Sequence, residues 1–280
     1  MQNGRDKHMG NDSSTSETTL FAGYSDYGYR RVVEQHGIRK LLFGKGSDAE
    51  EDTALLLAEP DVSIFEYPRL MLCGLLLRPA TRRVLLVGLG GGFLPAIIRR
   101  HRPDIHVTVV ELDPLVGSLA KEFFDYRPDS ANPLVIQDAR TFLENSRDNF
   151  DQIWLDAFDG EGIPVHLATY EFLELCKARL VSGGVLAQNL HVGHSRYFSH
   201  LATATEVFES FYLLKGPSNE NSMLFAVKGV TQPEPPKKAF ARGLKLHGHW
   251  LGGIHLKAEA AKAVCTYHKD RRAVLYDKDI

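Results

Sequence analysis

Between residues 83 and 208, short continuous apolar runs alternate with segments whose apolar positions recur every three or four residues. The first run, RVLLVG at 83–88, is typical of a strand that is covered on both faces, and the segment after it has the spacing of a helix. This unit occurs five times, and Gly183-Gly184 is expected to end the fourth helix. The expected strands are 83–88, 106–112, 133–137, 150–156 and 185–191, and the expected helices are 93–101, 114–126, 139–146, 166–180 and 195–208.

The alternation ends after residue 208. Two further apolar runs, 210–216 and 222–229, are joined only by the segment PSNEN. This connection is too short for a helix, so the two runs are predicted to form an antiparallel hairpin. The whole pattern predicts an α/β protein with a Rossmann-like, doubly wound, seven-stranded sheet. The sheet would finish in a terminal antiparallel β-hairpin, with one reversed strand near its edge.

The region before this sheet, residues 20–78, has a different pattern. Two short β-branched or alternating runs flank His36-Gly37 and predict a small N-terminal β-hairpin. The segment 66–77 is apolar enough for a buried helix. The main domain is therefore expected to cover residues 79–230.

Both termini are polar. Residues 1–19 are predicted to form a disordered tail, and the pair His8-Met9 resembles a cloning junction. Residues 231–280 are predicted to be a linker rich in proline and lysine, followed by a basic tail with a short helical piece at 256–264. This tail can pack on the domain, reach a partner subunit or stay mobile.

Composition and charge exclude several classes of partner. The formal net charge is −2, with 44% hydrophobic and 24% charged residues, so nothing favours a nucleic acid or an acidic membrane surface. No apolar run approaches the ~20 residues that cross a bilayer, so no membrane segment is expected. Three widely spaced cysteines, Cys73, Cys176 and Cys265, are typical of free thiols in a reducing cytoplasmic environment.

A glycine-rich loop follows the first strand of the main domain and opens a helix. Gly88, Gly90 and Gly92 form a G-x-G-x-G pattern, whereas the dinucleotide fingerprint would need glycine at Phe93. The pattern fits a loop that faces the sugar and amino-acid parts of an S-adenosyl compound. Glu111, about twenty residues further on, ends the next strand, where a carboxylate can bind ribose hydroxyls. The alternative is that these glycines only allow close packing.

Asp138 ends the third strand, in the segment QDAR. Its carboxylate can accept a hydrogen bond from an adenine amino group. It can also cap the helix that follows, and one aspartate can do both. The candidate cofactor-binding residues are Gly88, Leu89, Gly90, Gly92, Glu111, Leu112, Asp138 and Ala139.

Two aspartates, Asp156 and Asp159, follow the fourth strand in the segment WLDAFDGEGIP. Combined with VLLVGLGGG, VTVVELDP and VIQDARTFL, this segment resembles the spermidine synthase family, the polyamine aminopropyltransferases. That family has the class I S-adenosylmethionine-dependent methyltransferase fold. The resemblance covers residues 83 to about 229 and, more loosely, the N-terminal hairpin and the FEYPRLM helix.

The resemblance implies a role for each of these residues. Glu111 would hold the ribose, and Asp138 with Ala139 would contact the adenine. Asp156 would be the catalytic base, Asp159 would anchor the distal ammonium of a small amine, and Tyr67 would position that amine. The alternatives are a simple turn at Asp159 and a core position for Tyr67.

The chemistry explains why carboxylates are needed. A sulfonium ion transfers its alkyl group to a neutral amine, but a polyamine nitrogen with a pKa near 10 is protonated at pH 7. Neutralising it costs roughly 4 kcal/mol. A carboxylate beside that nitrogen can accept its proton as the new bond forms.

The sequence also departs from the family pattern. The loop aspartate that binds the donor amine is replaced by Gly91, the charge after Tyr67-Pro68 is reversed by Arg69, and the glutamine expected after Phe43-Gly44 is missing. The co-substrate can therefore be decarboxylated S-adenosylmethionine or S-adenosylmethionine itself.

Three functions remain open at this point. The first is transfer of an aminopropyl group to a small amine such as putrescine. The second is a methyltransferase, which can use Arg69 to bind an acidic acceptor, and the third is a non-catalytic member. The family resemblance implies a homodimer. No metal is expected, because no cysteine or acid lies at ligand spacing from His191, His194, His247, His249 and His255.

Overall fold

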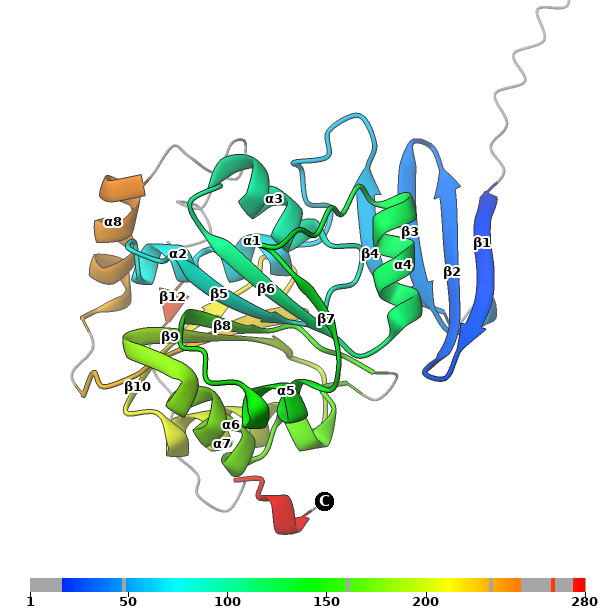
Figure 1. The fold of residues 1–280 in the computed structure, drawn as a ribbon. Helices are drawn as coiled ribbons and strands as arrows, with labels where there is room; N and C mark the ends of the chain where they lie inside the picture. The colour runs from blue at the N-terminus through cyan, green and yellow to red at the C-terminus, as the bar shows by residue number, and fades with distance from the viewer. Residues whose placement is uncertain are drawn as a thin grey trace, which may run out of the picture.

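The protein is described here by a computed structural model that covers residues 17–46, 49–159, 162–231, 234–247, 263–264 and 274–279. These residues form two β-sheets with helices around the larger one (Figure 1). Of the N-terminal tail predicted over residues 1–19, residues 1–16 lie outside the described residues, whereas Thr18 and Thr19 belong to the first strand, so the predicted boundary is too late. Most of the C-terminal tail between residues 248 and 273 also lies outside the described residues.

The larger sheet has the strand order β12-β10-β11-β9-β8-β5-β6-β7. Seven of its strands come from the predicted domain, and β11 runs antiparallel to β9, so the predicted reversed strand is confirmed. The eighth strand, β12, comes from the C-terminal tail, where a helical piece was expected, and it pairs with β10. The strands are β5 (Arg83–Val87), β6 (His106–Glu111), β7 (Leu134–Ile136), β8 (Phe150–Leu155), β9 (Leu180–His191), β10 (Ser210–Lys215), β11 (Asn221–Val227) and β12 (Ala263–Val264).

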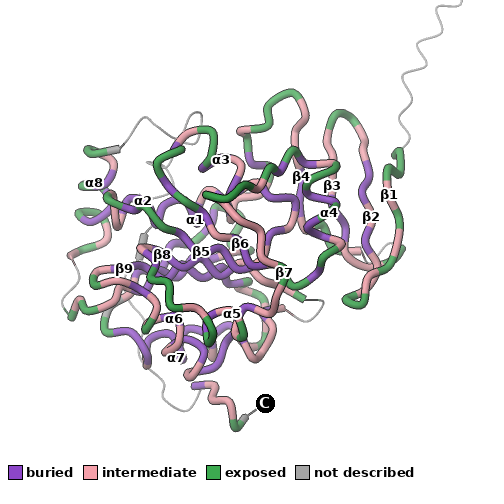
Figure 2. Tube along the Cα trace, viewed as in Figure 1, coloured by how far each residue is buried: buried purple, intermediate pink, exposed green. Residues whose placement is uncertain are grey.

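Helices cover both faces of this sheet, which explains the continuous apolar strands. In β5, Val84 and Leu86 join the core on one face, while Leu85 joins the core on the other. Figure 2 shows these central strands as buried. The first core packs under α1 (Tyr67–Leu72), α2 (Gly74–Leu77), α3 (Phe93–His101), α4 (Pro114–Phe123) and α8 (Pro236–His247), and the second under α5 (Ala139–Asn145), α6 (Tyr170–Arg179) and α7 (Tyr197–Val207).

Two predictions in the C-terminal half are wrong. Gly183-Gly184 does not end a helix: α6 stops at Arg179, and Leu180 already pairs with Phe150 in β9. The strand pairing ends the helix, and Gly183, with φ of 66°, allows an irregularity inside β9. The segment predicted as a linker contains α8, which packs against α2.

The N-terminal sheet is larger than the predicted hairpin. Its four strands lie side by side in the order β1-β2-β3-β4, and the turn at His36-Gly37 joins the two that were predicted. The outer strand β1 is largely exposed (Figure 2), and β4 begins with three acids, so neither has the apolar alternation that marks a strand. The strands are β1 (Thr18–Ser25), β2 (Gly28–Gln35), β3 (Ile38–Phe43) and β4 (Glu50–Leu56).

Candidate active site

The glycine loop lies at the carboxyl end of β5, pressed against the start of the loop after β8. Gly88 has φ of 91°, and its N–H donates to the carbonyl of Val110 over 2.9 Å. A β-carbon on Gly88 would lie 2.3 Å from the carbonyl oxygen of Asp156. Both the backbone conformation and this close approach require glycine.

Glu111 braces the glycine loop from the end of β6. Its two carboxylate oxygens accept hydrogen bonds from the N–H groups of Leu89, at 2.9 Å, and Asp113, at 2.8 Å. Burial raises the pKa of Glu111 to about 7. The neighbouring Asp113 caps α4 and forms an ion pair with Arg30 at 3.1 Å.

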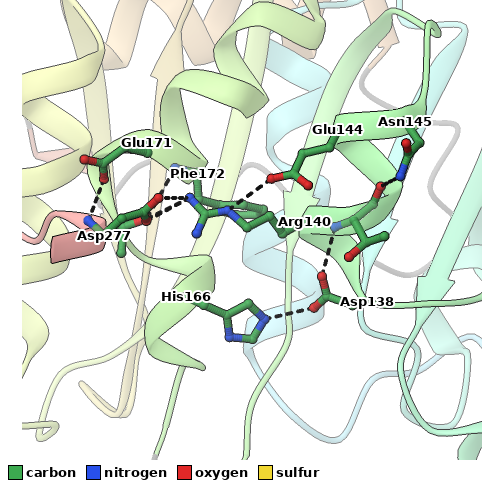
Figure 3. Close-up of polar contacts among 10 residues, drawn as sticks. Asp138, Arg140, Glu144, Asn145, His166, Glu171, Phe172 and Asp277 are labelled. Atoms are coloured by element: carbon green, nitrogen blue, oxygen red, sulfur yellow. Dashed lines mark hydrogen bonds and ion pairs between the residues drawn. The ribbon is translucent and has the colours of Figure 1, made fainter. Parts of the chain in front are cut away.

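Asp138 is the N-cap of α5, as the structural alternative predicted. One of its oxygens accepts from the N–H of Thr141 at 2.9 Å. The other lies 2.9 Å from Nε2 of His166, a residue that the sequence analysis did not single out (Figure 3). His166 comes from the loop after β8, so two loops meet at this carboxylate and form one side of the cavity.

The C-terminal residues 274–279 dock beside this pair. Asp277 accepts from Arg140, with both oxygens at 2.8 Å, and from the hydroxyl of Thr169 at 2.6 Å (Figure 3). The N–H of Asp277 donates to Glu171 over 2.8 Å. Of the three possibilities for the tail, packing on the domain is therefore confirmed for this segment.

Replacing Asp277 with alanine is expected to lower the melting temperature by at most about 4 °C, because Arg140 and Thr169 lose their shared acceptor. The effect is small because 41% of the Asp277 side chain is exposed to solvent, which screens the pair to about 1 kcal/mol at most. Thermal denaturation followed by circular dichroism measures it. Lys278→Ala in the same segment is the matched control, and an equal loss in both variants would contradict this account.

Two cavities meet at the carboxyl ends of the strands. The glycine-loop cavity, of about 680 Å³, is lined by the loop, Glu111 and Asp138. The acidic cavity, of about 650 Å³, lies next to it between β4, α1 and the loop after β8. The residues that line both cavities are Phe43, Glu50, Asp52, Leu89, Gly90, Asp156, Phe158 and Asp159.

The acidic cavity is lined by more acidic than basic side chains. Its described lining includes no lysine or arginine, and its basic side chains are His191 and His194. Arg69, which reverses a charge in the sequence pattern, lies outside this lining and donates to the carbonyls of Ser63 and Phe65. Arg69 is therefore not among the described lining residues of the cavity where the methyltransferase alternative would use it. The acids are Glu50, Glu51, Asp52, Asp156, Asp159 and Glu220.

Asp156 lies at the junction of the two cavities. It accepts a hydrogen bond from Nδ2 of Asn189 at 3.0 Å, and burial together with the charge of Asp52 raises its pKa to about 7. Tyr67 lines the same cavity, and its hydroxyl donates to the carbonyl of Asp52 over 3.4 Å. Burial and the charges of Asp156 and Asp52 raise the pKa of Tyr67, so it stays a neutral donor.

The structure brings most of the predicted residues together. Asp156 and Asp159 line both cavities and Tyr67 lines the acidic one. The backbone of Asp159 also exchanges hydrogen bonds with the backbone of Gly162, and the predicted turn residue Gly160 lies outside the described residues. Gly92 lies outside both linings, because it starts α3 with φ of 79° and packs against Tyr126. The predicted residues that line the glycine-loop cavity are Gly88, Leu89, Gly90, Glu111, Leu112, Asp138 and Ala139.

The lining residues that the sequence analysis did not single out include Asp52, Asn189 and His166. Asn189 follows the apolar run of the fifth strand, so the rule that parallel strands end at one edge could have identified it. Asp52 sits in a strand that was not predicted, and no local signal marks it. In the described part of the chain, no group of His, Cys, Asp and Glu could hold a metal ion, and no helix is long and apolar enough to cross a membrane.

The sheet order, the glycine loop and the acid at the end of β6 define a Rossmann-like α/β protein with a methyltransferase-type sheet. The chain belongs to the spermine/spermidine synthase family, whose domain model matches residues 66–214.

Curated relatives and solved structures are also similar to this chain. The polyamine aminopropyltransferase of Vibrio vulnificus is 38% identical over 65% of this chain and 63% of that protein. The N-terminal histidine N-methyltransferase of Emericella nidulans is 33% identical over 72% of this chain and 39% of that protein. The chain thus spans less than two thirds of the length of both. The spermidine synthase from Thermotoga maritima has the same fold, with a TM-score of 0.65 at 20% identity over 86% of this chain and 83% of that one.

Proposed function

We propose that this chain transfers an aminopropyl group from decarboxylated S-adenosylmethionine to a small amine such as putrescine. The observation that carries the proposal is the acidic cavity beside the glycine-loop cavity, with Asp156 in the wall they share. A cationic acceptor in the acidic cavity would lie next to a sulfonium donor in the glycine-loop cavity. The polyamine aminopropyltransferase of Vibrio vulnificus, at 38% identity, supports the same reaction.

The proposed step is an in-line displacement. The acceptor nitrogen forms a bond to the methylene carbon of the donor's aminopropyl arm that is attached to sulfur, the bond from that carbon to sulfur breaks, and its electron pair stays on sulfur. The leaving group is the neutral thioether nucleoside. Asp156 accepts the proton that the nitrogen loses, and Asn189 holds the carboxylate in place.

The charge of the acidic cavity selects the acceptor. A diamine carries two positive charges at neutral pH, and six acids line the cavity without a facing lysine or arginine among the described residues. Asp159 would hold the distal ammonium, and Tyr67 would orient the reacting nitrogen. An acidic methyl acceptor would meet only repulsion here, since Arg69 is directed elsewhere.

Methyl transfer from S-adenosylmethionine is the second candidate function. It is favoured by Gly91, which leaves the loop without the aspartate that binds the donor amine in the family, and by the likeness to the N-methyltransferase of Emericella nidulans. The pairing of subunits predicted from the family stays a prediction.

One experiment separates the two functions. The purified protein is incubated with putrescine and either donor, and the products are identified by mass spectrometry. We expect spermidine and methylthioadenosine from the decarboxylated donor and no methylated amine from S-adenosylmethionine. Methylated product from the intact donor would contradict the proposal.

The pH profile should reveal the base. At saturating donor, kcat/KM for the acceptor is expected to rise about tenfold per pH unit below pH 7 and then bend, because Asp156, with its pKa raised to about 7, must be deprotonated to accept a proton. The profile is measured with two acceptors of different amine pKa. A bend that stays near pH 7 belongs to the protein, whereas a bend that moves with the acceptor would rule out Asp156 as its source.

A further inference from the structure

Asp52 lies where the two cavities meet. It comes from β4 of the N-terminal sheet, and it lines both cavities. A β-carbon on Gly90 would lie 2.5 Å from Oδ2 of Asp52. The carboxylate is therefore in contact with the glycine loop, on the side where the loop faces the cavities.

The hydrogen bonds around Asp52 fix its position but do not balance its charge. The hydroxyl of Thr53 donates to it over 2.8 Å and accepts from the N–H of Gly91 over 2.7 Å, so β4 is tied to the loop at this point. The nearby guanidinium of Arg30 opposes part of the burial effect on the pKa of Asp52, but its ion pair is with Asp113, at 3.1 Å. Burial raises the pKa of Asp52 to about 6, so at neutral pH the carboxylate is mostly ionised inside the protein.

A negative charge in this position is stabilised by a cationic ligand. Glu50, Asp156 and Asp159 also line both cavities, so the shared wall carries four acids, which repel an anion that enters between them. The carboxylate of intact S-adenosylmethionine would bring such an anion. An ammonium group on the donor arm would instead be attracted.

We propose that Asp52 binds the primary ammonium of the donor's aminopropyl arm, and that it replaces the loop aspartate that the family has where this chain has Gly91. The inference rests on the proposed function and deepens it. In this chain the carboxylate that binds the donor amine would come from β4, which packs on the glycine loop, and not from the loop itself. Strand β4 would thereby set the preference for a decarboxylated donor. Glu50 also lines both cavities, but it is exposed, and solvent weakens its attraction.

Asp52→Asn tests the proposal, since it keeps the size of the side chain and an oxygen for the Thr53 hydroxyl. Calorimetric titrations compare decarboxylated S-adenosylmethionine with methylthioadenosine, which has the same nucleoside but lacks the amine. We expect the variant to bind the decarboxylated donor about 10- to 100-fold more weakly and methylthioadenosine within about twofold of wild type. Glu34→Gln is the matched control, because Glu34 belongs to the same sheet, pairs with Arg39 at 2.7 Å and lies outside both cavities.

Each other outcome overturns the assignment. Equal losses for both ligands would make Asp52 a support of the nucleoside site, and unchanged binding of both would remove it from donor recognition. The proposed function fails differently: wild-type protein would then make methylated product from S-adenosylmethionine, whatever Asp52→Asn does to binding. A preference for the decarboxylated donor that survives in Asp52→Asn would keep the proposed function and reject only this inference.

Discussion

Asp156→Asn is expected to lower kcat by about 10²- to 10⁴-fold and to leave donor affinity within a few fold of wild type. Asparagine keeps the shape of the side chain and an acceptor for the amide of Asn189, which lies 3.0 Å from the carboxylate. It cannot take a proton from the attacking nitrogen at neutral pH. Steady-state kinetics at saturating donor and acceptor measure the loss, and titration with methylthioadenosine shows whether the nucleoside site is intact.

Asp159→Asn is the matched comparison. Asp159 is exposed and lies three residues further on, so its replacement should mainly raise the KM for the acceptor, because the distal ammonium loses an anchor. A kcat for Asp156→Asn within threefold of wild type would falsify the assignment of Asp156 as the base. Equal kcat losses in both variants would mean that the two carboxylates act as one unit.

Gly88→Ala should destabilise the protein by about 2–4 kcal/mol and abolish donor binding. The added β-carbon would lie 2.3 Å from the carbonyl oxygen of Asp156, a backbone atom that can move only with the end of β8. The φ of 91° adds backbone strain for any residue other than glycine. Thermal denaturation should show a melting temperature lower by roughly 5–15 °C.

Gly37→Ala separates the two causes. Gly37 has φ of 73° but nothing within 4 Å of its β-carbon position, so its replacement brings the strain without the clash. We expect a loss of about 1 kcal/mol there, with donor binding unchanged. If both variants lose the same stability, the close approach between the loop and Asp156 contributes nothing.

The larger sheet could be predicted from the sequence because its signals are local. The continuous apolar run of β5 reflects burial on both faces, and the short PSNEN connection leaves only a hairpin. The N-terminal sheet was underestimated for the opposite reason. β4 is held by pairing with β3. Its first three residues are all acids, so its sequence lacks the apolar alternation that predicts a strand.

The site residues also divide into those that local sequence signals predict and those that depend on tertiary packing. Glu111 and Asp156 end strands of a predictable sheet, so their meeting at one edge could be expected from topology. Asp52 and His166 reach the glycine-loop cavity from a separate sheet and a long loop, and their approach depends on tertiary packing that no local pattern encodes. The sequence shows the charge of Arg69 but not the direction of its side chain, which donates to the backbone carbonyl of Ser63.

Gly91 and Thr53 constrain the order in which mutations can accumulate. The backbone at Gly91 has no positive φ, so conformation does not forbid a side chain there. A β-carbon would nevertheless lie 2.5 Å from the methyl group of Thr53 and 3.0 Å from the ring of Phe124. A lineage that gained an aspartate on the loop would therefore need Thr53→Ser or a smaller change first. The effect of a substitution at either position is therefore expected to depend on the residue at the other, which favours one order of the two changes.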